Sequence, residues 1–245
     1  MTLLSVVVPA YREADTIAEA LVRLLNVLNG LARPYEVIVV SDGNTDGTEA
    51  IVQDLGFPCV RVLHYDQNQG KGYALRHGVH HSMGELIAFI DADLDIHPEG
   101  IARFIEILET KDVDAVVASK IHPDSKVNYP VFRRVQSRVF RLLVELLFRL
   151  DVSDTQTGLK LFRREVLETC FSRVTTSGFA FDLELLVLAN DAGFRVVEGP
   201  LEIDYKFSTT TGGSAVLEML RDMTRLQRRR FSGKRDGTWV PHRAR

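Results

Sequence analysis

The stretch Glu85-Leu-Ile-Ala-Phe-Ile-Asp91-Ala-Asp93-Leu-Asp95 decides the fold, because an apolar strand runs directly into carboxylates. An apolar run such as residues 86–90 is typical of a strand buried in a parallel sheet. Carboxylates are almost never buried without a partner, since removing their charge from water costs too much free energy. The acidic residues therefore mark the point where the strand leaves the core. In open α/β sheets this edge, at the carboxyl ends of the strands, is the crevice where ligands bind.

The two aspartates Asp91 and Asp93 are one residue apart in an expected turn, so both are able to face one hard divalent cation. Mg²⁺ usually takes one or two protein carboxylates and fills its other positions with phosphate oxygens and water. The pattern therefore favours a metal that holds a diphosphate. A solvated loop with an aspartate that caps the helix at Pro98-Glu99 explains the same residues, and the short motif alone does not decide. Its position after a buried strand favours a functional site.

Strands and helices alternate on both sides of this stretch. We expect strands at residues 3–8, 36–40, 60–63, 86–90 and 115–118, and helices between them at residues 48–55, 70–81 and 99–110, with Asp15 capping the first helix. This alternation implies right-handed crossovers and a single, mainly parallel α/β sheet flanked by helices. Further along, we expect a long helix at 131–150, an apolar stretch at 159–162, a helix at 181–190 and a last strand within 195–205.

The composition is that of a soluble globular protein, with 45% hydrophobic and 26% charged residues among 245. The net charge of -3 gives no field that would attract nucleic acid, so no nucleic-acid partner is expected. Cys59 and Cys170 are far apart in apolar settings and are predicted to be reduced thiols of a cytosolic protein. No apolar run is long enough to span a bilayer, and Met1 leads directly into strand residues, which predicts no signal peptide.

Two more loops should emerge at the same edge as Asp91. The first strand ends in Val8-Pro9-Ala10-Tyr11-Arg12-Glu13 and the second in Val40-Ser41-Asp42-Gly43. An aspartate after the second strand is able to accept hydrogen bonds from a base or ribose, although Asp42 and Asp46 could equally shape a turn and cap a helix. The first loop lacks the G-x-G-x-x-G fingerprint, and Gly70-Lys71-Gly72 is too short for a P-loop. A Rossmann dehydrogenase and a P-loop NTPase therefore fit poorly.

Taken in order, four motifs resemble those of glycosyltransferase family 2, which has the GT-A fold. They are Val6-Val-Val-Pro-Ala-Tyr-Arg-Glu13, Val39-Val-Ser-Asp-Gly-Asn-Thr-Asp-Gly-Thr48, Asn68-Gln-Gly-Lys-Gly72 and Asp91-Ala-Asp93. Two later segments, Asp154-Thr-Gln-Thr-Gly-Leu-Lys-Leu-Phe-Arg163 and Gly178-Phe-Ala-Phe-Asp-Leu-Glu-Leu-Leu186, are similar to the branch that makes polyprenyl-phosphate sugars, which includes dolichyl-phosphate mannose synthase and dolichyl-phosphate glucosyltransferase. The resemblance covers about residues 3 to 214.

The resemblance implies a nucleotide-sugar pocket and a metal. The residues implied in nucleotide-sugar binding are Pro9, Ala10, Tyr11, Glu13, Asp42, Lys71, Asp91, Ala92 and Asp93. Asp91 and Asp93 would bind Mg²⁺ or Mn²⁺ that bridges the diphosphate and neutralises charge on the leaving group. Asp95 stands where the mannose-synthase relatives often carry a glutamine, which adds a third carboxylate to the implied metal set.

An acceptor that is a lipid monophosphate needs no general base, because it is already anionic and needs only cations that hold it in line with the sugar. By resemblance, the acceptor set is Lys120, Arg133, Ser137 and Lys206, which together with Asp91 and Asp93 form the implied catalytic group. Two of these positions carry lysine where relatives carry arginine, and lysine does not bind phosphate in a fork. Asp182 and Glu184 either orient the sugar or acceptor, or are the paired acids of an ordinary core-edge helix.

We expect a GT-A domain at residues 1–213 and a basic C-terminal helix and tail at 214–245. The tail and the apolar, arginine-flanked residues 131–150 predict a peripheral position on the cytoplasmic face of a membrane, although an ordinary core helix and a solubilising tail explain them too. The expected reaction is inverting transfer of a hexose from a nucleotide diphosphate to a polyprenyl phosphate, with UDP-glucose slightly favoured over GDP-mannose. The alternatives are a saccharide or other non-lipid acceptor and, less favoured, a non-catalytic nucleotide-sugar-binding protein.

Overall fold

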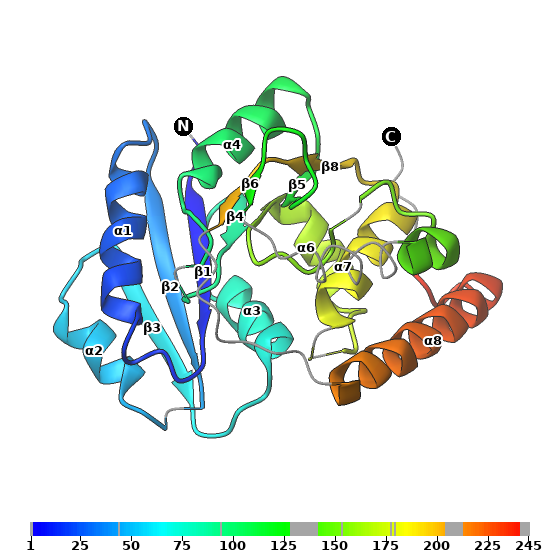
Figure 1. The fold of residues 1–245 in the computed structure, drawn as a ribbon, viewed down its shortest axis with the longest axis horizontal. Coiled ribbons are helices and arrows are strands. Elements are labelled where there is room, and N and C mark those ends of the chain that lie inside the picture. Colours follow the sequence, from blue (N-terminus) through cyan, green and yellow to red (C-terminus); the bar gives the residue numbers. More distant parts are fainter. Residues whose placement is uncertain are drawn as a thin grey trace.

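The fold is a single central sheet with helices on both faces (Figure 1). The computed structural model describes residues 2–43, 45–93, 95–127, 142–152, 154–176, 178, 180–203 and 213–240, the last range with side chains from residue 220 onward.

Seven strands form the sheet in the order β3-β2-β1-β4-β7-β5-β8. Their bounds are β1 Leu4–Ala10, β2 Tyr35–Asp42, β3 Val60–Tyr65, β4 Leu86–Phe89, β5 Ala115–Ala118, β7 Lys160–Arg163 and β8 Val196–Gly199. β7 is antiparallel to both of its neighbours, and every other pair is parallel. A second, two-stranded sheet pairs β6 Lys126–Val127 with β9 Glu202–Ile203. The predicted mainly parallel α/β sheet is confirmed.

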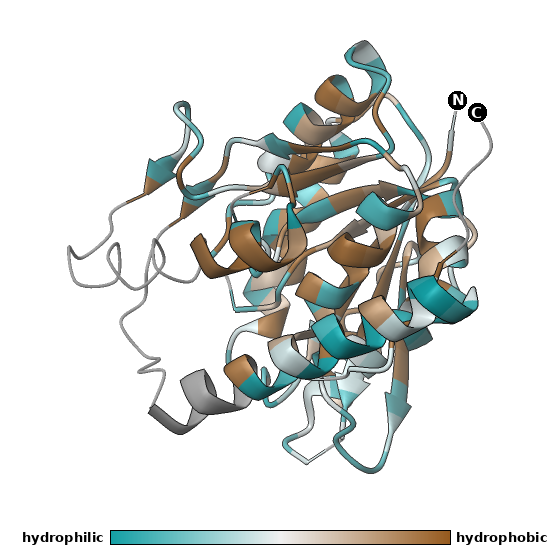
Figure 2. Cartoon of the chain, turned by 90° about the vertical axis from the view of Figure 1, so that its right-hand side faces the viewer, coloured by the Kyte–Doolittle hydropathy of each residue, from teal (hydrophilic) through white to brown (hydrophobic). Residues whose placement is uncertain are grey.

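Successive strand residues face two separate hydrophobic cores, because side chains alternate along a strand. Val6 and Val8 pack with α1 Ile17–Asn29, α2 Thr48–Asp54 and α4 Gly100–Thr110. Val7, on the opposite face, packs with α3 Lys71–His80, α6 Arg164–Phe171, α7 Ala180–Asp191 and α8 Gly213–Asp236. The strands between these layers are mostly hydrophobic, whereas hydrophilic residues gather on the outer sides of the helices (Figure 2).

Several local predictions differ from the structure. The N-cap residue of α1 is Thr16, not Asp15. Its hydroxyl accepts no hydrogen bond from a helix N–H and instead donates one to Glu13 Oε2 at 2.6 Å. The single strand expected within 195–205 is two short strands, β8 and β9, in different sheets. Of the long helix expected at 131–150, residues 142–148 are helical and residues 131–141 lie outside the described part. Among the described helices, none is long and apolar enough to cross a membrane.

The C-terminal helix α8 packs against the body of the protein. Met223 and Leu226 of α8 are buried, as are Trp239 and Val240 beyond its end, and all four belong to the core that contains α7. Three of the basic residues of the tail also turn inward: Arg229 pairs with Glu184, and Arg230 and Lys234 pair with Asp191. These ion pairs hold the tail to α7. The domain boundary at residue 213 stays a prediction.

Asp191, at the end of α7, is the main anchor of α8. It accepts hydrogen bonds from Arg230 Nε at 2.6 Å, Arg230 Nη2 at 2.7 Å, Lys234 Nζ at 2.7 Å and Trp239 Nε1 at 2.9 Å. Burial alone would raise the pKa of Asp191, but the bonds from Arg230 and Lys234 outweigh it and lower the pKa. Because the Asp191 side chain is only 5% exposed, the loss of its charge would leave two cations without their partner.

We predict that Asp191→Asn lowers the free energy of unfolding by about 3 kcal/mol at pH 7, as expected for breaking a buried ion pair. The pKa in the folded state lies below the unfolded value of about 3.9, so the contribution exists above that value and is lost as the pH falls through the folded pKa. Urea unfolding from pH 7 to pH 3 should therefore show the variant and the wild type converging in acid. Asp222→Asn, in an exposed pair with Arg225 on the same helix, should cost about 0.5 kcal/mol or less; an equal loss in both variants would contradict the anchor.

Candidate functional site at the carboxyl edge of the sheet

Three loops are tied together where β1, β2 and β3 end. The backbone N–H of Ala14 donates to Asp46 Oδ2 at 3.0 Å, and that of Glu13 donates to Thr48 Oγ1 at 3.2 Å. The N–H of Gln69 donates to Asp42 Oδ1 at 2.7 Å. The loops after β1 and β3 are therefore both fixed to the end of β2 or to the loop that follows it, so they form one continuous rim.

The residues expected to bind the nucleotide sugar do not all present a side chain to this rim. Ala10 and Ala92 are each 2% exposed and lie in the core, which leaves their backbone as the part able to meet a ligand. Tyr11 is 43% exposed, and the Arg12 guanidinium lies 5.2 Å from its ring centroid. Asp42 is buried and already holds the Gln69 N–H, so it shapes the rim whether or not it also contacts a nucleotide.

Asp91 is surrounded by positive charge. Its Oδ1 lies 2.5 Å from Lys71 Nζ, and the two side chains are 26% and 33% exposed. Burial favours the protonated acid, but Lys71, Lys160 and Lys120 outweigh it and lower the pKa of Asp91. Lys71 responds in the opposite sense: burial alone would lower its pKa, while Asp91, Asp182 and Asp93 raise it. The pair is therefore charged across the physiological pH range.

Asp93 is surrounded by negative charge instead. Asp93 is an exposed residue. Desolvation by the surrounding protein and repulsion from Asp91, Asp95 and Glu13 nevertheless raise its pKa to about 6. One hydrogen bond, from the Asp95 N–H at 3.1 Å, acts in the opposite direction. The pKa of Glu13 is raised by burial and by Asp91, Asp46 and Asp95. Crowded carboxylates with excess negative charge are what a divalent cation relieves, so this donor set fits Mg²⁺ or Mn²⁺ and gives Asp93 the leading part.

The three residues expected to bind the metal, Asp91, Asp93 and Asp95, have different surroundings. Within the part of the chain that the structure describes, no group of three or more His, Cys, Asp or Glu residues is arranged to hold a metal ion. Asp91 is paired with Lys71, and Asp95 contacts Asp93 through its backbone N–H. The inclusion of Asp95 in the metal set stays a prediction.

One of the four expected acceptor residues is described by the structure. Lys120 follows β5, and its Nζ lies 3.5 Å from Asp154 Oδ2, with the two side chains 25% and 15% exposed. The positive charge of Lys120 also lowers the pKa of Asp91, so Lys120 lies close enough to Asp91 to interact with it electrostatically. Arg133, Ser137 and Lys206 lie outside the described residues.

Asp182 and Glu184, the two acids in the first half of α7, are both occupied. Glu184 is fully buried and accepts hydrogen bonds from the backbone N–H and hydroxyl groups of Thr175 and Thr176, besides its ion pair with Arg229. Asp182 Oδ1 lies 2.8 Å from Lys160 Nζ. For Glu184, the geometry therefore favours the interpretation as a paired acid of a core helix.

Two residues near Asp91 were not singled out from the sequence. Lys160 is a lone charge within the apolar run 159–162, a signal that could have been noticed. A Cβ atom on Gly158 would lie 1.9 Å from Asp91 Oδ2, so only glycine allows the backbone to approach this carboxylate so closely. Nothing in the local sequence shows that residue 158 faces residue 91, because the contact joins segments far apart in the chain.

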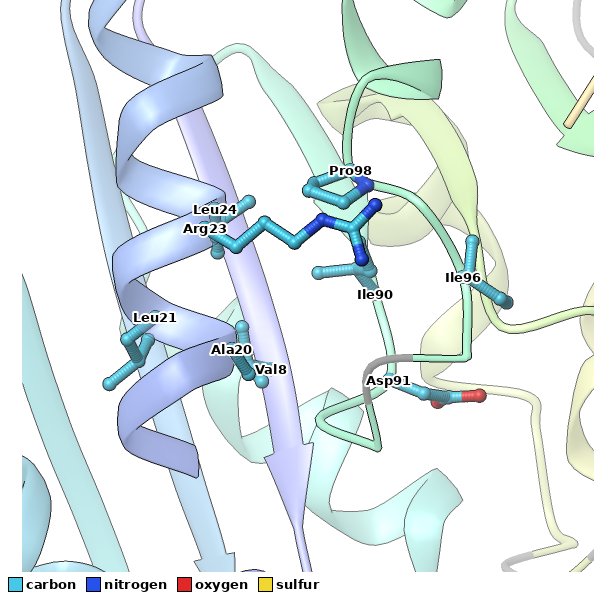
Figure 3. A pocket seen from close by; sticks show the side chains of 9 residues that line it. All are labelled: Val8, Ala20, Leu21, Arg23, Leu24, Ile90, Asp91, Ile96 and Pro98. Carbon is cyan, nitrogen blue, oxygen red and sulfur yellow. The ribbon is translucent and has the colours of Figure 1, made fainter. Parts of the chain in front are cut away.

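A shallow pocket adjoins this site between α1 and the segment after β4 (Figure 3). Most of its lining is apolar, with residues Val8, Ala20, Leu21, Leu24, Ile90, Ile96 and Pro98 beside Arg23 and Asp91. In Figure 3 the Asp91 carboxylate points away from α1 and from the other lining residues. The pocket therefore lies behind the charged site, and a polar ligand of Asp91 would approach from the other side.

Comparison with known proteins places these motifs in a family. Residues 5–171 match the family model described as Glycosyl transferase family 2. The chain is 33% identical over 234 residues to dolichyl-phosphate beta-glucosyltransferase ALG5C of Trichomonas vaginalis, covering 90% of this chain and 69% of that protein. It is 29% identical to dolichyl-phosphate beta-glucosyltransferase of Dictyostelium discoideum, covering 94% and 75%. It is 34% identical to glycosyltransferase AglD of Haloferax volcanii over 89% of this chain but only 35% of that protein.

Solved structures share the fold. Glucosyl-3-phosphoglycerate synthase from Mycobacterium tuberculosis, in complex with Mn²⁺, UDP-glucose and phosphoglyceric acid, matches with a TM-score of 0.71 and 21% identity, over 92% of this chain and 80% of that one. Mannosyl-3-phosphoglycerate synthase from Rubrobacter xylanophilus matches with a TM-score of 0.69 and 20% identity, over 97% and 76%. At this level of identity the similarity establishes the architecture.

We predict that Asp42→Ala lowers both stability and nucleotide affinity. The change removes the part-buried hydrogen bond that the Gln69 N–H donates to the Asp42 carboxylate. Losing a hydrogen bond to a charged group costs about 1.5–3 kcal/mol, and the loss also loosens the rim that a nucleotide would contact. Thermal unfolding and calorimetry with uridine diphosphate measure the two effects. Asp66→Ala, an exposed residue of the loop that follows β3, should change neither; unaltered affinity in Asp42→Ala would leave Asp42 with a structural role alone.

Proposed function

The chain belongs to glycosyltransferase family 2, and on this premise we propose that it moves a hexose from a nucleotide diphosphate sugar to a polyprenyl phosphate. UDP-glucose is the favoured donor, ahead of GDP-mannose. Support comes from two relatives, at 33% and 29% identity, that are dolichyl-phosphate beta-glucosyltransferases and whose lengths this chain covers by 69% and 75%. AglD adds less, because the chain spans about a third of that protein.

The observation that carries the proposal is the division of charge at the end of β4. Asp93 is crowded by carboxylates, whereas Asp91 is balanced by lysines. Asp93 would hold the metal, with Asp91 beside it. When bound, Mg²⁺ or Mn²⁺ supplies Lewis-acid stabilisation to the leaving diphosphate. Lys71 Nζ, 2.5 Å from Asp91, brings a further positive charge to the place where that diphosphate would lie.

The acceptor is inferred from the cations and from the ion pairs that engage Asp182 and Glu184. A hydroxyl acceptor needs a group that removes its proton, whereas a phosphate acceptor needs only to be held in line. Glu184 is engaged with two threonines and Arg229, and Asp182 is paired with Lys160, so neither is free to act as that base. Lys120, with Arg133, Ser137 and Lys206, would hold the lipid phosphate.

Membrane contact follows from the same proposal, because a polyprenyl phosphate lies in a bilayer. The outward residues of α8 include the exposed arginines Arg221, Arg225, Arg228 and Arg235. Leu142 and Leu146, one helical turn apart, are 63% and 79% exposed, and Phe231 of α8 is 69% exposed. Exposed basic and apolar groups of this kind suit an anionic membrane, and we propose that the enzyme lies peripherally on the cytoplasmic face.

We predict that the purified protein transfers labelled glucose from UDP-glucose to a short prenyl phosphate in the presence of Mn²⁺ or Mg²⁺, and that EDTA abolishes this transfer. Asp93→Asn should lower turnover by about a hundredfold or more, because the leading metal ligand is lost. Asp95→Asn is the matched neighbour and should cost less. Full transfer by Asp93→Asn in excess EDTA would contradict the metal assignment, and transfer from GDP-mannose alone would replace the donor.

The acceptor site has its own test. Arg133→Ala should raise the KM for prenyl phosphate and lower kcat, while the affinity for UDP stays unchanged, because the lost contact is made to the acceptor. Arg133→Lys should recover only part of the activity, since the fork is lost. Transfer to a free sugar hydroxyl, with no transfer to prenyl phosphates, would overturn the lipid acceptor and favour the saccharide alternative.

A further inference from the structure

Lys160 carries a buried ammonium group on an interior strand of the sheet. It is the first residue of β7, which lies between β4 and β5, and it is 1% exposed. Its neighbours Leu159 and Leu161 belong to the apolar core. Burying an ammonium ion is costly unless it is paired and hydrogen-bonded. Lys160 meets both conditions through Asp182, at 2.8 Å, and through the carbonyl oxygen of Thr157, at 2.6 Å.

The hydrogen bond between Lys160 and Thr157 links Lys160 to Asp91, because the residue after Thr157 lies against the Asp91 carboxylate. Gly158 follows Thr157, and its backbone lies so close to Asp91 that a Cβ atom would come within 1.9 Å of Oδ2. Lys160 therefore fixes the carbonyl of a turn whose next residue forms a wall for the Asp91 carboxylate. A glycine at 158 is needed because any larger side chain would occupy the position of that carboxylate.

A second connection runs from Asp182 to Asp91 through Lys71. The ammonium of Lys71 contacts Asp91 at 2.5 Å and also feels the charge of Asp182. Gly72, next in sequence, lies against Phe181, the neighbour of Asp182: a Cβ atom there would be 2.5 Å from Phe181 Cδ2. The start of α3 and the start of α7 are thus packed together, and Asp91 is held on one side by Lys71 and on the other by Gly158.

Stability alone does not account for an ion pair in this place. Replacement of a buried ion pair by apolar residues of similar volume is often neutral or stabilising, because desolvation offsets the attraction. We propose that the Lys160–Asp182 pair is a positioning element for Asp91, which sets the turn at Thr157-Gly158 and the charge around Lys71 so that the Asp91 carboxylate is held ready for the metal and diphosphate. The inference rests on the proposed function and adds two positioning residues to it.

The test is the double replacement Lys160→Met with Asp182→Leu, which removes both charges and keeps the volume. Calorimetry measures the affinity for UDP with and without Mn²⁺, and steady-state assays measure kcat. We define the metal gain as the factor by which Mn²⁺ raises the affinity for UDP. We expect the variant to keep the wild-type melting temperature and the wild-type affinity for UDP without metal. Its metal gain and its kcat should each fall by about tenfold or more, because small displacements of a reacting group cost this much. If the pair had only a structural role, metal gain and kcat would not fall while the melting temperature stayed the same. A variant with the melting temperature, metal gain and kcat of the wild type would overturn the proposal.

Two further variants keep the result decisive. Gly158→Ala leaves Lys160 and Asp182 in place and displaces the Asp91 carboxylate directly, so it should show the same loss of metal gain. If the double variant fails to fold, Gly158→Ala becomes the deciding measurement. An unchanged metal gain in Gly158→Ala would then overturn the proposal. Glu36→Gln is the control for general weakening: Glu36 is buried at the opposite edge of the sheet, paired with Arg61 at 2.9 Å, and should lower the melting temperature without changing the metal gain.

The wild type separates this inference from the function on which it rests. A wild-type protein that gains no affinity for UDP from Mn²⁺ overturns the proposed function and this inference together. A wild type that shows the gain, beside variants that keep it, overturns the positioning role alone.

Discussion

The structure of the site depends on how the charge of Asp91 is compensated. This carboxylate stands where the apolar strand β4 leaves the core, and without neighbouring cations its desolvation would favour the neutral acid. Lys71, Lys160 and Lys120 come from three different segments and keep it ionised. Asp93, two residues later, has acids instead of lysines around it and a pKa raised to about 6. One short motif therefore contains two different carboxylates: the negative charge of Asp91 is compensated by lysines of the protein, and that of Asp93 would be compensated by a bound cation.

The same matching of buried acids with cations organises the C-terminal half. Glu184 and Asp191 lie two helical turns apart on α7 and receive Arg229, Arg230 and Lys234 from α8. The basic composition of the tail therefore has two origins: inward residues that bind α7, and outward residues such as Arg225 and Arg228 that are exposed. A count of charges along the sequence cannot separate the two groups, because the acids that neutralise the first group lie about forty residues earlier in the chain.

Sequence patterns predicted what is encoded locally. The family, the mainly parallel sheet and the strand that ends at Asp91 follow from motifs and apolar runs, and these predictions are confirmed. The antiparallel direction of β7 could not be predicted, since an apolar run of four residues has no direction. The approach of Gly158 to Asp91 and the pairing of Lys160 with Asp182 depend on packing between distant segments, which no single-sequence pattern records. The roles of Arg133, Ser137 and Lys206 stay predictions.

The order of the strands has a consequence for how the chain acquires its structure. β5 pairs with β7 and β8 and with none of the strands that precede it in the chain, because β7 is inserted between β4 and β5. A segment that ended after β5 would leave this buried, apolar strand without a partner on either side. The first half therefore cannot reach its native sheet alone, and its closure waits for contacts of long sequence separation, which are slow to form. Until β7 arrives, the exposed edges of β4 and β5 are sites for association with other chains.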